Sequence, residues 1–272
     1  MREMKKYVIS LAILATLLTS CASEFNRVYK TTDNDYKYEF AKECFARGKF
    51  TQAITLLQEL VTIQKGTDNA QECLYMLAMA EYCDRDYESA SETFKKYYQT
   101  YPKGIYAEQA AFYIGQSLYQ STPEPRLDQT ATVNAISAYQ DFLDFFPESQ
   151  LKAKASSRMF ELTDKLVLKE YLSAKLYYNL GDYFGNCTNG GSNFEACIVT
   201  SENALKTYPF TTMREEFAVL IMKSKYELAR QSVEDKKIER YRDAEDECYG
   251  FINEYPESVE RKTAERYIKK CK

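Results

Sequence analysis

Two short stretches, GKFTQA at residues 48–53 and RDYESA at residues 85–90, are alike in sequence and predict alike structures. Each reads as a turn followed by the opening of an amphipathic helix. Leu57 and Phe94 stand four residues after the small Ala53 and Ala90, at the same bulky core position. Two helices approach to about 8–10 Å only where a side chain is short. Each stretch is therefore predicted to open the second helix of a helix-turn-helix pair.

The prolines repeat this pattern along the chain. Proline cannot continue a helix, so a proline at a constant position predicts that a helix ends at the same point of each repeat. Four prolines stand twelve residues after a small residue, in the pairs Ala90 and Pro102, Ala135 and Pro147, Cys197 and Pro209, and Ala244 and Pro256. A generic helical bundle, the alternative, does not predict this spacing.

The spacing resembles that of the tetratricopeptide repeat, a helix-turn-helix unit of about 34 residues. The resemblance implies an all-α superhelix of about five repeats with a capping helix from Val259. The expected repeats are 35–66, 71–104, 107–149, 153–211 and 214–258. The third is interrupted at 121–134, and the fourth contains the loop GNCTNGGSN at 185–193. We divide the chain into repeats 1–3 at 34–149, and repeats 4–5 with the capping helix at 150–272.

The first twenty residues, MREMKKYVISLAILATLLTS, predict a cleaved signal peptide. Its apolar run from Tyr7 to Leu18 follows basic residues and is shorter than the ~20 residues that span a bilayer. The next residue completes Leu18-Thr19-Ser20-Cys21, which resembles the lipobox of bacterial lipoproteins, in which the cysteine thiol is lipidated. Residues 21–33 would then be a lipidated tether. By resemblance to sorted lipoproteins, Ala22 in place of aspartate after the cysteine favours the outer membrane. The alternative is an ordinary cleavage site that happens to contain a cysteine.

Composition argues against catalysis and against nucleic-acid binding. The chain has no histidine, which removes the commonest general base and zinc ligand. It also has no glycine motif that could cradle a phosphate. The net charge of −4 includes a leader of +2, so the rest carries −6, whereas phosphate neutralisation needs a basic face. We therefore predict no enzyme activity, no metal site, no cofactor and no nucleic-acid partner.

Eight cysteines occur without the spacing of a disulfide framework. Assigning Cys21 to lipidation leaves an odd number. Cys187 and Cys197 flank the Gly- and Asn-rich loop and could form a disulfide. The alternative is that the cysteines are free and packed as small hydrophobic residues.

Six aromatic residues recur on one face of the first helices of repeats 1–3. They are Tyr38, Phe45, Tyr75, Tyr82, Phe112 and Tyr119, spaced by 37 residues between repeats and by seven within each helix. In repeats of this type that face lines the concave groove, where rings suit an extended peptide. The alternative is that the rings form core between neighbouring helices.

The basic helix that follows Glu260 also has two interpretations. It could meet an acidic partner or lipid headgroups, or it could be a solvated cap of the repeat stack.

The lipobox, the length, the repeats and the loops together resemble the essential repeat lipoprotein of the β-barrel assembly machinery, the BamD family. The most specific stretches are Ala41 to Leu57, and Ala174-Lys175-Leu176-Tyr177-Tyr178 leading toward Tyr208-Pro209. The resemblance implies a non-enzymatic scaffold on the periplasmic face of the outer membrane. Its C-terminal half would dock on the barrel-forming subunit, and its N-terminal repeats would receive unfolded outer-membrane proteins. Arg214, offset by about one residue from the family's arginine, would form a salt bridge to the barrel-forming subunit.

Two other functions remain open. The first is that of a different repeat lipoprotein, which coordinates cell-envelope growth or division. The second is that of a glycan-binding lipoprotein of a nutrient uptake system. Proteins of the second kind are usually much longer and rich in tryptophan, which this chain lacks.

Overall fold

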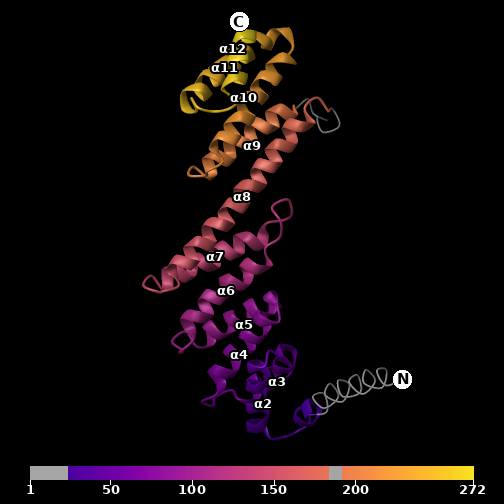
Figure 1. The fold of residues 1–272 in the computed structure, drawn as a ribbon, viewed down its shortest axis with the longest axis vertical. Coiled ribbons are helices and arrows are strands. Elements are labelled where there is room, and N and C mark those ends of the chain that lie inside the picture. The colour runs from indigo at the N-terminus through magenta and orange to yellow at the C-terminus, as the bar shows by residue number, and fades with distance from the viewer. Residues whose placement is uncertain (1–23, 184–191) are drawn as a thin grey trace, which may run out of the picture. The chain divides into compact units, whose positions relative to one another are not determined.

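The computed structural model describes residues 24–183 and 192–272, and all regular structure within them is helical (Figure 1). The predicted signal peptide, Cys21 and Cys187 lie outside these residues. The helices are α2 (Asn34–Ala46), α3 (Phe50–Ile63), α4 (Ala70–Cys83), α5 (Tyr87–Thr100), α6 (Ala107–Ser121), α7 (Thr130–Phe145), α8 (Lys152–Leu180), α9 (Asn193–Thr207), α10 (Arg214–Arg230), α11 (Glu234–Glu254) and α12 (Arg261–Cys271).

These helices form five consecutive pairs, from α2–α3 to α10–α11, followed by the single helix α12. Within the described residues, the main helix–helix contacts join neighbours in sequence, such as α2 with α3 and α11 with α12. Such nearest-neighbour packing is what defines a repeat architecture. The predicted all-α class, the five repeats and the capping helix are therefore confirmed.

Contacts divide the chain into two compact units. The first unit holds the repeats from α2 to α7 and the beginning of α8, as far as Met159. The second unit holds the rest of α8 and α9 to α12, together with the segment Pro123–Gln129. The division thus falls inside α8, which is 29 residues long. No described helix, α8 included, is long and apolar enough to cross a membrane.

The small residues that open the second helices lie at the helix contacts. All of them have an exposed fraction of 0%, namely Ala53, Ala90, Ala135, Cys197 and Ala244. Four residues after them, Leu57, Phe94 and Tyr139 are also fully buried. Burying a side chain of this size contributes about 1.5–3 kcal/mol. The repeat spacing read from the sequence is thus the spacing of the core.

The turns inside the first two repeats have the same backbone conformation. Gly48 has a φ of +72°, and Arg85, 37 residues later, has a φ of +69°. In both turns this residue's N–H donates to the carbonyl three residues earlier, at 3.0 Å in the first and 3.1 Å in the second. Asp86 then caps α5 by accepting a hydrogen bond from the Ser89 N–H at 3.2 Å. The turn therefore needs a left-handed residue, which glycine supplies without strain and arginine does not.

The segment expected to be a tether differs in part from that prediction. Residues 24–29 are helical, and Val28 is fully buried in the core of the first repeat. Phe25 packs against the same core and stacks on Tyr29, with ring centroids 6.1 Å apart. Burying these apolar side chains explains why the segment packs on the repeat.

The core of the second unit ends at α12. The rings of Tyr226 and Tyr267 stack with centroids 3.9 Å apart, and Ile268 lies beside them in the same cluster. The opposite side of α12 is exposed and largely basic. At the other end of the unit, Asn193 donates hydrogen bonds to the carbonyls of Gly181 and Tyr183, at 3.1 and 3.0 Å. These bonds fix the start of α9 against the end of α8.

Candidate functional site

Two of the six predicted groove residues belong to the core. Tyr38 is 2% exposed and Phe112 is 1% exposed. The Phe112 ring packs against Tyr139 and Phe142, with centroids at 5.8 and 5.5 Å. Rings buried to this degree offer no surface to a peptide, so for these two residues the core alternative holds.

Tyr75 and Tyr82 are partly buried in a cluster of rings between repeats 2 and 3. Tyr75 stacks on Tyr106 with centroids 4.3 Å apart and planes 11° apart. Tyr82 meets the edges of Tyr87 and Tyr113, at 5.5 and 5.1 Å. Burial raises the pKa of Tyr75 and of Tyr113, so both phenols stay protonated at physiological pH. Tyr75 and Tyr82 therefore belong partly to the core and partly to the surface.

Phe45 and Tyr119, the other two partly buried rings, have partners of different kinds. Phe45 meets Phe50 edge to face at 5.7 Å. Arg158 places its guanidinium 4.4 Å from the centroid of the Tyr119 ring and donates a hydrogen bond of 2.8 Å to its hydroxyl. The groove hypothesis therefore applies to the four partly buried rings, Phe45, Tyr75, Tyr82 and Tyr119, for which it stays a prediction.

The sequence interpretation missed the centre of this ring cluster. Tyr97 is fully buried, donates a hydrogen bond to Gln71 Oε1 at 3.2 Å and accepts one from the Tyr106 N–H at 3.3 Å. A Cβ on Gly104 would lie 2.6 Å from the Tyr97 hydroxyl, so a larger residue there would force the Tyr97 side chain to shift. The spacing to the proline could have identified this core position. Tyr97, Phe142 and Phe251 all stand five residues before a repeat proline, and all three are buried.

Arg214, the predicted docking residue, is the first residue of α10 and is 43% exposed. Its Nη1 donates to the Pro209 carbonyl at 3.0 Å, and its Nη2 lies 3.5 Å from Glu254 Oε1. Arg261 repeats the first of these contacts, donating to the Pro256 carbonyl at 3.1 Å. Both arginines thus tie the start of a helix to the preceding turn. The salt bridge of Arg214 to a partner stays a prediction.

No disulfide joins any two of the described cysteines, which are Cys44, Cys73, Cys83, Cys197, Cys248 and Cys271. Cys197 is fully buried, and burial raises the pKa of its thiol. Burial likewise raises the pKa of Cys73 to about 12. These thiols pack as small apolar groups and are poor nucleophiles. The disulfide between Cys187 and Cys197 stays a prediction, since Cys187 lies outside the described residues.

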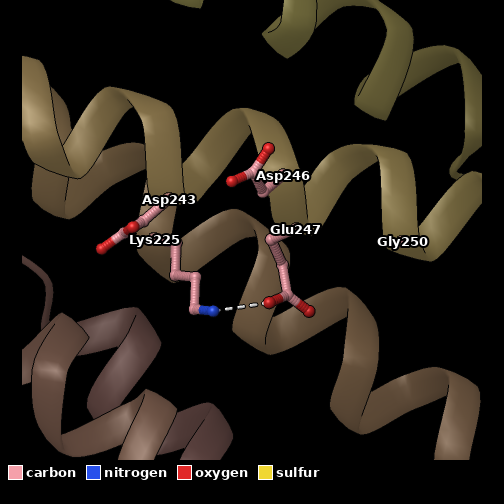
Figure 2. Close-up of a pocket in the computed structure, with 5 residues that line it drawn as sticks. All are labelled: Lys225, Asp243, Asp246, Glu247 and Gly250. Atoms are coloured by element: carbon pink, nitrogen blue, oxygen red, sulfur yellow. Dashed lines mark hydrogen bonds and ion pairs between the residues drawn. The ribbon is translucent and has the colours of Figure 1, made fainter.

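One surface hollow lies where α10 meets α11 (Figure 2). Lys225 on α10 forms an ion pair with Glu247 on α11, and Asp243 and Asp246 add two further carboxylates. Gly250 also lines the hollow, and a Cβ there would meet nothing within 4 Å. Within the described residues no cluster of His, Cys, Asp or Glu is arranged to hold a metal ion. The hollow is therefore an acidic surface without a recognisable ligand site.

A longer groove, called here the α8–α10 groove, lies on the first helices of the last two repeats. Its lining comes from α8, α10 and the turn before α12, and consists of Tyr171, Lys175, Tyr178, Asn179, Glu215, Glu216, Val219, Leu220, Lys223, Val259 and Glu260. This lining combines apolar and aromatic side chains with charged ones.

Comparison with known protein families shows which family this chain belongs to. A family model described as YfiO, outer membrane lipoprotein, matches residues 30–189, which is more than half of the chain. The chain belongs to the YfiO family. The matched range contains the first three repeats and α8. The similarity to the β-barrel assembly lipoproteins that the sequence suggested is thereby confirmed.

Two curated proteins are similar to this YfiO-family chain over part of its length. One is the outer membrane protein assembly factor BamD of Caulobacter vibrioides, 22% identical over 64% of this chain and 58% of that protein. The other is the putative outer membrane protein assembly factor BamD of Aquifex aeolicus, 26% identical over 50% of this chain and 43% of that protein. The chain thus spans about half the length of these relatives.

A solved structure, the TPR2AB-domain:pHSP90-complex of yeast Sti1, also matches. It is 13% identical, with a TM-score of 0.40, over 88% of this chain and 98% of that chain.

Proposed function

We propose that the chain is a non-enzymatic scaffold of an outer-membrane β-barrel assembly complex. Membership of the YfiO family over residues 30–189 is the observation that carries this proposal. The names of the two curated relatives support it. A repeat fold supports it as well, because stacked helix pairs present extended surfaces to other proteins.

The proposed location is the periplasmic face of the outer membrane, with the chain anchored by lipid on Cys21. The lipobox-like sequence supports this anchor. Multiple acyl chains hold a protein firmly, because each buried CH₂ contributes about 0.8 kcal/mol. Replacing Cys21 by alanine should release the protein into the soluble fraction or leave its precursor uncleaved.

The first unit is proposed to receive unfolded outer-membrane proteins. The four partly buried rings of Phe45, Tyr75, Tyr82 and Tyr119 offer ring surfaces, and each of them contacts another ring or Arg158. Rings held in this way bind apolar side chains at little entropic cost. The second unit is proposed to dock on the barrel-forming subunit, with Arg214 exposed enough to exchange its Glu254 contact for one to the partner.

The test is cross-linking of the lipoprotein in intact cells, followed by detergent extraction and identification of partners by mass spectrometry. A barrel protein with periplasmic domains is the expected partner. Arg214→Glu should lower its recovery, whereas Arg261→Glu, which removes the same helix-start contact one repeat later, should not. Recovery of cell-wall synthesis or division proteins alone would refute the proposal.

A further inference from the structure

The exposed side of α12 carries a row of basic side chains that the proposed function does not use. Lys262, Arg266, Lys269 and Lys270 stand at positions i, i+4, i+7 and i+8, which places them on one side of the helix. All four are exposed. We infer that this row, called here the basic face of α12, binds the anionic headgroups of a phospholipid bilayer.

The packing of the opposite side of α12 fixes the direction of the basic face. Ala264 is fully buried, and Tyr267 and Ile268 are each 8% exposed in the core of the second unit. These residues recur at i, i+3 and i+4, so the helix cannot rotate without exposing them to water. A row of charges held in this way meets a planar surface at little further cost in ordering the backbone.

The charges of the basic face are not neutralised within the second unit. Both acidic residues of 260–272 already have a partner, because Glu265 binds Arg261 at 3.0 Å and Glu260 binds Lys223 at 2.7 Å. The three lysines of the basic face form no ion pair with any described residue. Their ammonium groups can therefore bind an external anion.

Helix stability does not explain the basic residue in the first turn of α12. A cation near a helix N-terminus is unfavourable, because the helix dipole places a positive partial charge there. Helices α10 and α11 follow this rule, since each has two acidic residues in its first turn, Glu215 and Glu216 in α10 and Glu234 and Asp235 in α11. The first turn of α12 has no acidic residue and contains Lys262 instead. This lysine opposes the local preference of the helix, which indicates a role outside the fold.

A bilayer fits the basic face better than an acidic protein does. Stable protein interfaces centre on buried aromatic and apolar side chains, whereas no large apolar side chain is exposed within residues 261–272. The same residues carry six basic side chains and one acidic side chain. The inference also rests on the proposed lipid anchor, which would keep the chain at a membrane, where weak contacts act at a high local concentration.

The experiment uses residues 21–272 with Cys21→Ser, which keep every described residue and cannot be lipidated. Sedimentation at low salt should show binding to vesicles of phosphatidylcholine with about 30 mol % phosphatidylglycerol, and none to phosphatidylcholine alone. Lys262→Gln combined with Lys269→Gln should weaken binding about 20-fold, since each lysine near an anionic surface contributes about fivefold. The matched control, Lys206→Gln combined with Lys236→Gln, removes the same charge from exposed lysines of α9 and α11 and should weaken binding at most about twofold.

Salt and a soluble polyanion complete the test. Raising the salt from about 0.05 to 0.5 M should abolish vesicle binding. Labelled poly-L-glutamate should bind more weakly than the vesicles at equal concentrations of negative charge, because a flexible chain loses entropy when it aligns with a rigid row of cations.

The inference is overturned by no binding to the anionic vesicles or by equal losses in the two double variants. Tighter binding of poly-L-glutamate than of the vesicles would also overturn it and would indicate an acidic protein partner. The tests of the Cys21 anchor and of the cross-linked partners fail or succeed independently, because neither the anchor nor a partner protein is present in this experiment.

Discussion

The first unit joins its middle repeats through a network of aromatic rings, whereas the second unit adds several ion pairs between helices. In the first unit Tyr75, Tyr97 and Tyr106 meet between repeats 2 and 3. In the second unit Lys223 pairs with Glu260, and Lys225 with Glu247. The side chains of those pairs are 23–28% exposed. Aromatic rings that are buried away from water contribute more to folding stability than ion pairs that are screened by solvent. The stability of the two units should therefore respond differently to mutation and to salt.

The largest effect is expected at Tyr97, the centre of the ring network. Tyr97→Ala should lower the free energy of unfolding of the first unit by about 3–5 kcal/mol, because it removes a fully buried ring. Hydrogen exchange of the α4, α5 and α6 amides during urea titration measures this. The neighbouring Tyr98, partly buried, is the control, and its replacement by alanine should cost clearly less. Equal losses at the two positions would mean that the ring network is not what joins these repeats.

The next largest loss of stability is expected where a buried ion pair is broken, in comparison with a more exposed ion pair. Lys37 is 2% exposed and binds Glu59 at 2.9 Å between α2 and α3, whereas Lys225 and Glu247 are each 26% exposed. Glu59→Gln should cost about 1–3 kcal/mol, because it leaves a buried ammonium without its counter-ion. Glu247→Gln should cost at most about 1 kcal/mol, and less in 1 M salt.

Melting of each variant at low and high salt gives both values. A larger and salt-sensitive loss for Glu247→Gln would reverse the comparison between the units.

The repeats could be predicted from sequence because their signal is local. Small residues and prolines recur at a constant spacing, and both act on the helix that carries them. The burial of a ring depends on how the helix of the next repeat packs against it. For this reason Tyr38 and Phe112 are buried, while Tyr75 and Tyr82 are only partly buried. The α8–α10 groove was not predicted for the same reason, since Lys175 on α8 and Val259 in the turn before α12 are brought together only by the fold.

Glu81 is expected to make the stability of the first unit depend on pH. Its side chain is 4% exposed, its Oε2 has no hydrogen-bond partner, and burial is the main cause of its raised pKa. A carboxyl whose pKa is raised on folding favours the folded state fully below its unfolded pKa. That contribution is lost as the pH rises through the folded pKa.

Glu81→Gln should therefore gain stability relative to the wild-type chain as the pH rises from about 4 to 8, where the wild type must bury a charge. Urea titrations across this range measure the gain. Glu88, exposed on α5 and not among the charges that shift the pKa of Glu81, is the control, and Glu88→Gln should show no such trend. A constant difference across the range would show that Glu81 keeps its ordinary titration.

The smallest change in stability is expected for substitutions in the turns of the first two repeats. Arg85 has a φ of +69° where Gly48 has +72°, and both N–H groups make the same hydrogen bond. A left-handed conformation costs an L-residue about 1–2 kcal/mol, and glycine loses about 0.5–1 kcal/mol through its freer unfolded chain. Arg85→Gly should thus stabilise the first unit by about 0.5–1 kcal/mol.

Gly48→Ala should destabilise the same unit by a similar amount. A Cβ at Gly48 meets nothing within 4 Å, so that loss would come from the backbone alone and not from a clash. Thermal melts of the two single variants and of the double variant measure the pair, whose effects should nearly cancel because the turns lie in separate repeats. If Arg85→Gly is neutral, the arginine side chain must supply a compensating contact, and the two turns differ in energy despite their equal geometry.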